Sequence, residues 1–62
     1  MIRDIDPLVS MHDVCAMTRL SRATIYRRLE DGSFPPPKRI GGTTIRWPLS
    51  VVRQWIDDLP VG

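Results

Sequence analysis

The stretch from Met17 to Asp31 reads Met-Thr-Arg-Leu-Ser-Arg-Ala-Thr-Ile-Tyr-Arg-Arg-Leu-Glu-Asp. Ser21 is a favourable N-cap, because its hydroxyl can accept a hydrogen bond from a free backbone N–H in the first helical turn. Gly32, directly after the stretch, offers a C-terminal stop. The sequence therefore predicts a tight turn followed by a short basic helix over residues 21–31.

This helix is expected to have two different faces. Ile25 and Leu29 are four residues apart and share an apolar face that can dock on a core. The opposite face and the flanks are small, polar or basic, and comprise Ala23, Thr24, Tyr26 and Arg27. A face of this composition can enter the major groove of DNA, so we interpret the segment as a recognition helix.

A second short helix is expected before the turn. Ser10 followed by Asp13 resembles a capping box, with Asp in place of the usual Glu or Gln, and predicts a helix from Met11 to about Met17. Leu20 would fill the corner between the two helices. Helix, short turn and capped helix together form the helix-turn-helix pattern.

The segment after the second helix predicts a stiff loop and a β-hairpin. Phe34 is expected to fold back into the core, and the three prolines that follow it exclude a helix. A Gly-Gly-Thr turn at 41–43 then joins two strands, residues 38–40 and 44–47. Alternation along the second strand predicts that Ile45 and Trp47 point inward and Arg46 outward.

The two ends of the chain are expected to support this unit. Residues 1–9 are interpreted as a short arm with one strand-like turn, anchored by Leu8. The last helix should begin between Pro48 and Val51, with Ser50 as a candidate cap, and end near Asp58 or Leu59. Its apolar positions follow i, i+3, i+4, i+7 spacing and are Val52, Trp55, Ile56 and Leu59.

Length and charge are consistent with one small nucleic-acid-binding domain. The 62 residues contain no internal repeat and no linker, so we expect a single domain over residues 1–62 with a small core. Nine Lys and Arg against seven Asp and Glu give a net charge of +2, and the basic residues are concentrated in the middle of the chain. This balance permits nucleic-acid binding without requiring it.

Several function classes find no support in the sequence. Cys15 and His12 are the only residues of their types, so neither an internal disulfide nor an ordinary zinc site can be assembled. No nucleophile, base and orienting group can be combined, so we expect no enzyme, no metal and no cofactor. No apolar run approaches the roughly 20 residues of a membrane span, and a signal-peptide pattern is lacking, so we expect a cytoplasmic protein without a membrane partner.

The chain resembles the AlpA family of small phage and prophage regulators, which are related to excisionases and to the DNA-binding head of MerR-type proteins. The resemblance covers almost the whole chain and is carried by residues 20–27 (LSRATIYR), 32–35 (GSFP), 40–41, 45–47, Ser50 and 55–56. It implies a mainly α winged helix-turn-helix, with three helices and a two-stranded wing. It also implies binding to duplex DNA, as a transcriptional activator, a repressor or a prophage excision factor.

The chain departs from this family at two places. Pro36 stands where the family often has a basic residue, and Thr43 and Thr44 stand where the wing often carries Arg near its tip. We therefore expect the hairpin to contact DNA phosphates rather than to enter the minor groove. The expected DNA-binding residues are Ser21, Arg22, Ala23, Thr24, Tyr26, Arg27, Arg28, Lys38, Arg39 and Arg46.

Some of these residues have a second interpretation. The ring of Tyr26 could pack under the hairpin while its hydroxyl reaches a phosphate, and Arg28 could be structural because it lies nearer the apolar face. Trp47 and Trp55 could form a stacking platform for single strands, but the helical stripe that contains Trp55 favours core packing. His12 and Cys15 fit a helix surface and a small core better than catalysis.

The alternative function is a small protein-interaction module that docks a larger partner, such as an integrase, through an apolar face. RNA polymerase is a further candidate partner for a transcriptional regulator. Salt dependence distinguishes the two functions, because phosphate contacts weaken steeply as salt rises and apolar docking does not. A single domain offers few base contacts, so DNA binding is expected to need further copies on adjacent half-sites.

Overall fold

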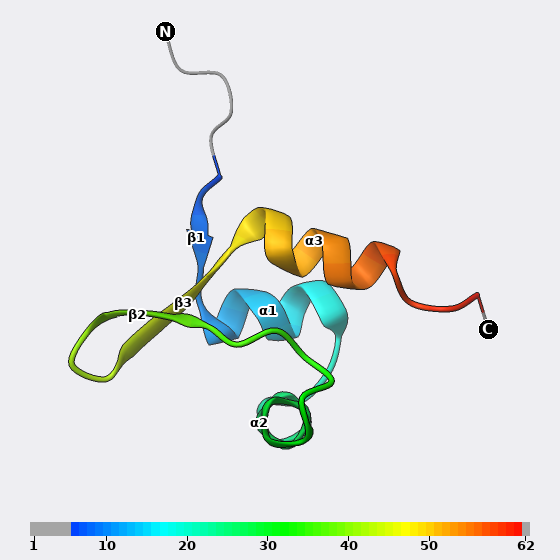
Figure 1. Ribbon diagram of the computed structural model, residues 1–62, viewed down its shortest axis with the longest axis horizontal. Coiled ribbons are helices and arrows are strands. Elements are labelled where there is room, and N and C mark those ends of the chain that lie inside the picture. Colours follow the sequence, from blue (N-terminus) through cyan, green and yellow to red (C-terminus); the bar gives the residue numbers. More distant parts are fainter. Residues whose placement is uncertain (1–5, 62) are drawn as a thin grey trace, which may run out of the picture.

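The computed structural model describes residues 6–61, which form three helices and a small three-stranded antiparallel sheet. The elements in order are β1 (Leu8–Val9), α1 (Met11–Thr18), α2 (Arg22–Asp31), β2 (Lys38–Gly41), β3 (Thr44–Pro48) and α3 (Leu49–Asp57). Figure 1 shows α1 and α3 beside each other, with the hairpin of β2 and β3 projecting to one side. The arrangement is mixed α and β, and α2, seen nearly down its axis in Figure 1, lies at the bottom of the view.

The expected capping box starts α1. The Ser10 hydroxyl oxygen accepts a hydrogen bond from the Asp13 N–H at 3.2 Å, and the Asp13 carboxylate accepts one from the Ser10 N–H at 3.0 Å. These bonds satisfy two backbone donors that an uncapped helix would leave free. The predicted position of this helix is confirmed.

Side-chain hydrogen bonds hold the turn between α1 and α2. Arg19 has a φ of 62°, in the left-handed region, and its N–H donates to the Cys15 carbonyl at 2.7 Å. The Thr18 hydroxyl donates to the Val14 carbonyl at 2.8 Å and accepts from the Leu20 N–H at 3.2 Å. The chain therefore leaves α1 in one direction, which sets the direction of α2.

The second helix has the predicted caps and rotation. The Ser21 hydroxyl oxygen accepts from the Thr24 N–H at 3.1 Å, and Gly32 ends α2 with a φ of 82°. Ile25 is fully buried, and Leu29 is partly buried against the same core cluster. The helix thus docks through its apolar face, as the spacing of Ile25 and Leu29 predicts.

The sheet corrects the expectation of a two-stranded wing. Its strand order is β1-β3-β2, so the short strand β1 pairs with the edge of β3 that the hairpin leaves open, with Leu8 opposite Pro48 and Val9 opposite Trp47. This pairing satisfies backbone groups that an edge strand would expose. The first five residues of the expected arm lie outside the described residues.

Leu8 does not anchor this strand. Its side chain is 48% exposed, whereas Val9 is partly buried against the core. Successive side chains of a strand point to opposite faces, so only one of the two can reach the core. The anchor expected at Leu8 is therefore supplied by Val9.

The hairpin turns at Gly42 and Thr43, between the paired residues Gly41 and Thr44. Gly42 has a φ of 43°, a backbone conformation that glycine adopts without steric cost. Along β3, Trp47 is fully buried and Ile45 is partly buried against the core, as predicted.

Phe34 is the centre of the aromatic core. It is 2% exposed and meets Trp47 and Trp55 edge-on, with ring centroids 5.9 Å and 4.7 Å apart. Both indole N–H groups are satisfied by backbone carbonyls, Trp47 by Pro35 and Trp55 by Ser33, each at 2.8 Å. The two tryptophans therefore hold the proline-rich loop, in agreement with core packing. The fully or nearly fully buried residues are Met11, Val14, Ile25, Phe34, Trp47 and Val52.

The last helix has the predicted span but not the expected cap. Pro48 occupies the N-cap position of α3 without a side-chain hydrogen bond, and Ser50 lies within the first turn. Ser50 instead donates to the carboxylate of Asp6, from its N–H at 2.8 Å and from its hydroxyl at 2.7 Å. The helix ends at Asp57, and Leu59 beyond it is 47% exposed. The expected apolar stripe therefore ends at Ile56 and does not include Leu59.

Candidate nucleic-acid interface

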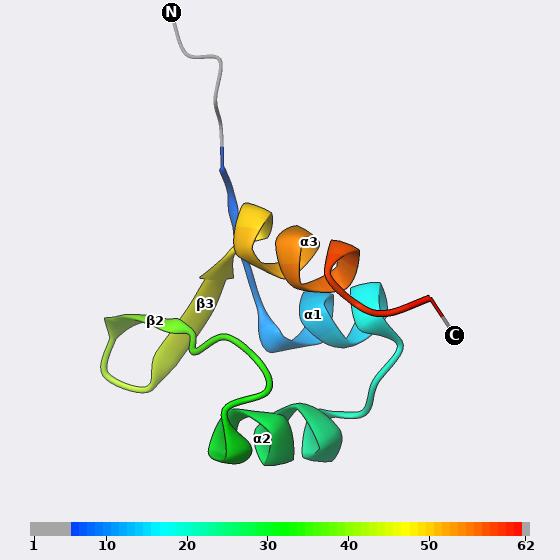
Figure 2. The same ribbon diagram turned by 45° about the vertical axis from the view of Figure 1, so that its right-hand side comes forward.

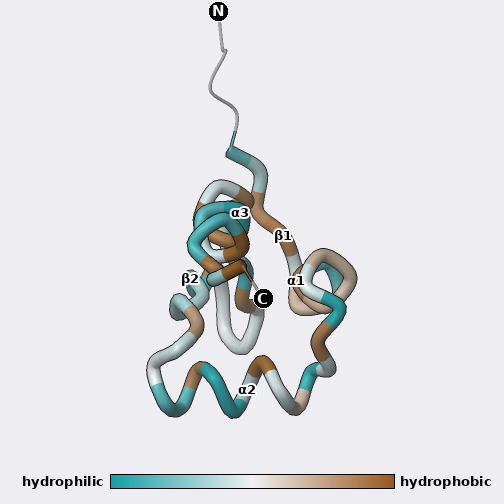
Figure 3. The backbone as a smooth tube through the Cα atoms, turned by 90° about the vertical axis from the view of Figure 1, so that its right-hand side faces the viewer, coloured by the Kyte–Doolittle hydropathy of each residue, from teal (hydrophilic) through white to brown (hydrophobic). Residues whose placement is uncertain are grey.

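One face of α2 carries most of the expected contact residues. Figure 2 shows that the other described elements lie on one side of this helix, and Figure 3 shows hydrophobic and hydrophilic residues alternating along its turns. The Ser21 and Thr24 hydroxyls are hydrogen-bonded to each other at 2.9 Å at the start of the helix. The exposed residues of this face are Ser21, Arg22, Ala23, Tyr26 and Arg27.

Arg28 lies apart from this face. It is partly buried, and its guanidinium carbon lies 5.9 Å from the centroid of the Trp55 ring. One terminal nitrogen donates to the Ser33 hydroxyl at 3.4 Å, and Nε is buried without a hydrogen-bond partner. A guanidinium over an indole ring is a favourable cation–π contact, so Arg28 links α2 to α3. Its contact with a phosphate stays a prediction.

The hairpin separates its three basic residues. Lys38 and Arg46 are directly opposite each other in the pairing of β2 and β3, so their side chains share one face. Arg39 is opposite Ile45 and belongs to the other face. Lys38 and Arg39 are exposed, whereas Arg46, expected to point outward, is partly buried and donates to the Ile45 carbonyl at 2.7 Å.

A hollow of about 380 Å³ joins α2 to the hairpin. It includes Arg22 and Tyr26 from α2 and Arg46 from β3, so it brings together residues of two expected contact elements. Tyr26 lines this hollow while 46% of the residue stays exposed. The complete lining is Ser10, Met11, His12, Arg22, Tyr26, Thr43, Thr44, Ile45 and Arg46.

Three of these lining residues, Ser10, Met11 and His12, come from the start of α1 and were not among the expected contacts. The sequence contained no signal for them, because their place beside the hairpin depends on how α1 packs. Next to them, the pKa of Asp13 is lowered by hydrogen bonds from the Ser10 N–H and hydroxyl, and further by the charges of His12 and Arg46. Asp13 is therefore ionised at neutral pH.

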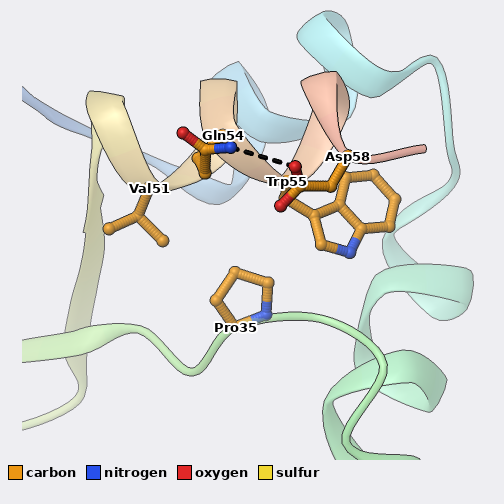
Figure 4. Close-up of a pocket in the computed structure, with 5 residues that line it drawn as sticks. All are labelled: Pro35, Val51, Gln54, Trp55 and Asp58. Carbon is orange, nitrogen blue, oxygen red and sulfur yellow. Dashed lines mark hydrogen bonds between the residues drawn. The ribbon is translucent and has the colours of Figure 1, made fainter.

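A second hollow, of about 300 Å³, lies between α3 and the proline-rich loop. Figure 4 shows Pro35 facing Val51 and Trp55 across it, with Gln54 and Asp58 at its rim. The Gln54 amide donates to the Asp58 carboxylate at 3.0 Å. The walls are largely apolar, so this hollow is suited to a protein contact rather than to a nucleic acid.

The described part of the chain offers neither a cluster of metal ligands nor a helix that could span a membrane. Within residues 6–61, no three His, Cys, Asp or Glu side chains lie close enough together to hold a metal ion. In the same range, none of the helices has the length and apolar composition needed to cross a membrane.

Comparison with known proteins gives two matches. A family model described as prophage CP4-57 regulatory protein (AlpA) matches residues 7–59. The uncharacterized protein ORF88 of Enterobacteria phage P4 is 39% identical over 44 residues, which are 71% of this chain and 50% of ORF88. The chain thus spans about half the length of that relative, and no solved structure matches it. Because the family model covers nearly the whole chain, the resemblance seen in the sequence is confirmed, and the protein belongs to the AlpA family of prophage regulatory proteins.

Proposed function

We propose that the protein is a winged helix-turn-helix that binds duplex DNA with sequence specificity. It would act as a phage-type transcriptional regulator or as an excision factor, with α2 in the major groove and the β2–β3 hairpin on the DNA backbone. The observation that carries this proposal is that α2 has a buried apolar face and an exposed basic face. Ile25 is buried in the core while Arg22 and Arg27 are exposed, so basic side chains face outward from a helix that docks through its other face.

The charges of the hairpin support a backbone contact. Lys38 and Arg46 lie directly opposite each other, and like charges in such a pair repel. An anionic partner on this face would relieve the repulsion, and phosphate is the anion that duplex DNA supplies. Thr43 and Thr44 at the turn provide hydroxyl donors but no Arg, which favours a phosphate clamp over minor-groove insertion.

The size of the domain suggests that several copies act together. A single α2 can contact only a few base pairs, and useful affinity would come from copies bound to adjacent half-sites. An integrase or RNA polymerase would be a second partner of the DNA-bound protein. Binding to DNA and to these partners would take place in the cytoplasm, where phage and bacterial DNA are located.

Selection of bound sequences from a random duplex library tests the proposal. Wild-type protein should enrich a defined sequence, and its affinity for that duplex should fall linearly on a log–log plot as salt rises. Arg53→Ala is a matched control, because Arg53 is exposed on α3 and does not line the hollow beside α2. The absence of enrichment, together with no binding to any duplex at low salt, would reject DNA binding.

The apolar hollow in Figure 4 favours a second function, the docking of a protein partner. Val51 and Trp55 could receive an apolar side chain of an integrase. Binding through these residues would change little with salt, because it would depend on buried apolar surface rather than on released counterions. Salt titration of each complex therefore distinguishes the two functions.

A further inference from the structure

We infer that the hollow between α1, α2 and the hairpin is a seat for one backbone phosphate of duplex DNA, held jointly by Arg22 and Arg46. This inference rests on the proposed function and adds to it the position of one phosphate. Arg22 belongs to α2 and Arg46 to β3, and both line the same hollow. Arginines from two separate elements thus line one hollow of about 380 Å³.

The charge of the lining favours an anion. None of the nine lining residues is acidic, and two of them are arginines. Arg46 donates to the carbonyl of Ile45, a neutral acceptor, so this hydrogen bond does not cancel its charge. By contrast, the apolar hollow beside α3 carries the carboxylate of Asp58 on its rim.

The nearby carboxylate of Asp13 is already engaged. It accepts hydrogen bonds from the N–H and the hydroxyl of Ser10, both at 3.0 Å, and it is not part of the lining. Both hydrogen bonds hold this carboxylate at the cap of α1 and lower the pKa of Asp13, which the charge of Arg46 lowers further. A phosphate bound by Arg22 and Arg46 would not need to displace the capping box.

The remaining lining residues suit a phosphate ligand. The hydroxyls of Tyr26, Thr43 and Thr44 can donate hydrogen bonds to phosphate oxygens, and His12 adds a ring N–H. Guanidinium groups bind phosphate through two parallel hydrogen bonds, which fixes orientation as well as adding affinity. A phosphate in this position would bind α2 and the hairpin to one point of the DNA backbone and so set how deeply α2 enters the groove.

The test combines arginine substitutions with neutralised phosphates. Each phosphate of the selected duplex is replaced in turn by an uncharged methylphosphonate, and affinity is measured for wild type, Arg22→Gln, Arg46→Gln and the double variant. At one phosphate, neutralisation should weaken wild-type binding about tenfold or more, the usual effect of losing a charge-assisted hydrogen bond. The same replacement should reduce the affinity of Arg22→Gln and of Arg46→Gln much less. The phosphate at which the loss of affinity shrinks should be the same for both variants.

Two further variants keep the result interpretable. Arg53→Gln should retain the full effect of the methylphosphonate, because Arg53 is exposed on α3 outside the hollow. Arg46→Lys keeps the charge but cannot form two parallel hydrogen bonds to a phosphate. Its loss of affinity when the same phosphate is neutralised should therefore lie between the losses of wild type and of Arg46→Gln. Arg46→Lys also replaces Arg46→Gln if that variant does not fold, as judged by circular dichroism.

The possible results separate this inference from the function on which it rests. In one outcome, the Arg22 and Arg46 substitutions reduce the effect of neutralising two different phosphates, or of none, while sequence-specific binding is retained. Either result would reject the shared phosphate seat and leave the proposed function standing. Failure of the wild-type protein to bind any duplex would overturn both. Coupling of both arginines to one phosphate supports the seat.

Discussion

The carboxylate of Asp6 accepts two hydrogen bonds from Ser50, a residue 44 positions later in the chain. One bond comes from the Ser50 N–H and the other from its hydroxyl, so Asp6 satisfies a free donor in the first turn of α3. Pro48, at the N-cap, makes no side-chain hydrogen bond. The segment before β1 therefore caps the last helix, and Asp6 is held against the first turn of α3.

This cap predicts a dependence of stability on pH. The N–H of Ser50, and then its hydroxyl, lower the pKa of Asp6 below its ordinary value of 3.8. A carboxyl with a lowered pKa stabilises the folded state above its ordinary pKa and loses that contribution as the pH falls through the lowered value. Asp6→Ala should therefore lower the melting temperature at neutral pH, and the difference from wild type should disappear in strong acid.

Ser50→Ala is the matched variant for this prediction. It removes the hydroxyl but keeps the N–H, so it should show a smaller loss with the same pH dependence. Thermal melting followed by circular dichroism between about pH 2 and pH 7 measures both variants, across the range in which carboxyl groups titrate. A constant difference between Asp6→Ala and wild type over this range would contradict the cap.

Ile25→Ala should unfold much of the protein. Ile25 is fully buried, and truncation of such a side chain costs about 2–5 kcal/mol, a large part of the stability of so small a domain. Ile25→Val should cost only about 0.5–1.5 kcal/mol and serves as the control. Urea denaturation measures both losses, and a well-folded Ile25→Ala protein would mean that α2 docks through a different face.

Arg27→Ala should abolish sequence preference and leave the fold intact. The Arg27 side chain is exposed on α2, away from buried Ile25, and a good bidentate base contact contributes about 1–3 kcal/mol of discrimination. Competition binding with the selected duplex and a random duplex measures this preference, with Arg53→Ala as the control. An equal loss of affinity for both duplexes would identify Arg27 as a phosphate contact instead.

Thr43→Ala and Arg46→Ala should have different effects on the hairpin. Thr43 lies at the exposed turn, and its loss should change binding little. Arg46→Ala should weaken binding to all duplexes alike and lower the salt slope by about one unit, as expected for the loss of one phosphate contact. If Thr43→Ala instead changed the selected sequence beside the major-groove site, the turn would be reading bases.

Arg19→Gly should stabilise the fold. Arg19 is exposed and has a φ of 62°, a conformation that costs a residue with a Cβ atom roughly 1–2 kcal/mol but costs glycine little. Part of this gain is offset by the greater freedom of glycine in the unfolded chain, so we expect a net gain of about 1 kcal/mol or less. Arg53→Gly, in the middle of α3, should instead destabilise by about 1 kcal/mol. Equal losses for the two variants in urea denaturation would contradict this account of the turn.

The sequence by itself determined the features that depend on near neighbours. Ser10 with Asp13, and Ser21 with Thr24, form their caps across three residues, and each cap was readable from that spacing. The burial of Ile25 followed from helical periodicity and that of Trp47 from strand alternation. The family could be recognised for the same reason, because its motifs are short and lie in order along the chain.

The tertiary structure alone decided the features that join distant parts of the chain. Pairing of β1 with β3 turned the expected two-stranded wing into a three-stranded sheet, and it brought Val9 rather than Leu8 to the core. The contact of Arg28 with Trp55 and the meeting of Arg22 with Arg46 at one hollow likewise depend on how whole elements pack. Periodicity specifies which face of an element is apolar, but not which neighbour covers it or where an edge strand finds its partner. The face of α2 was therefore predictable from its residues, whereas the hollow beside it arose only when α1, α2 and the hairpin packed together.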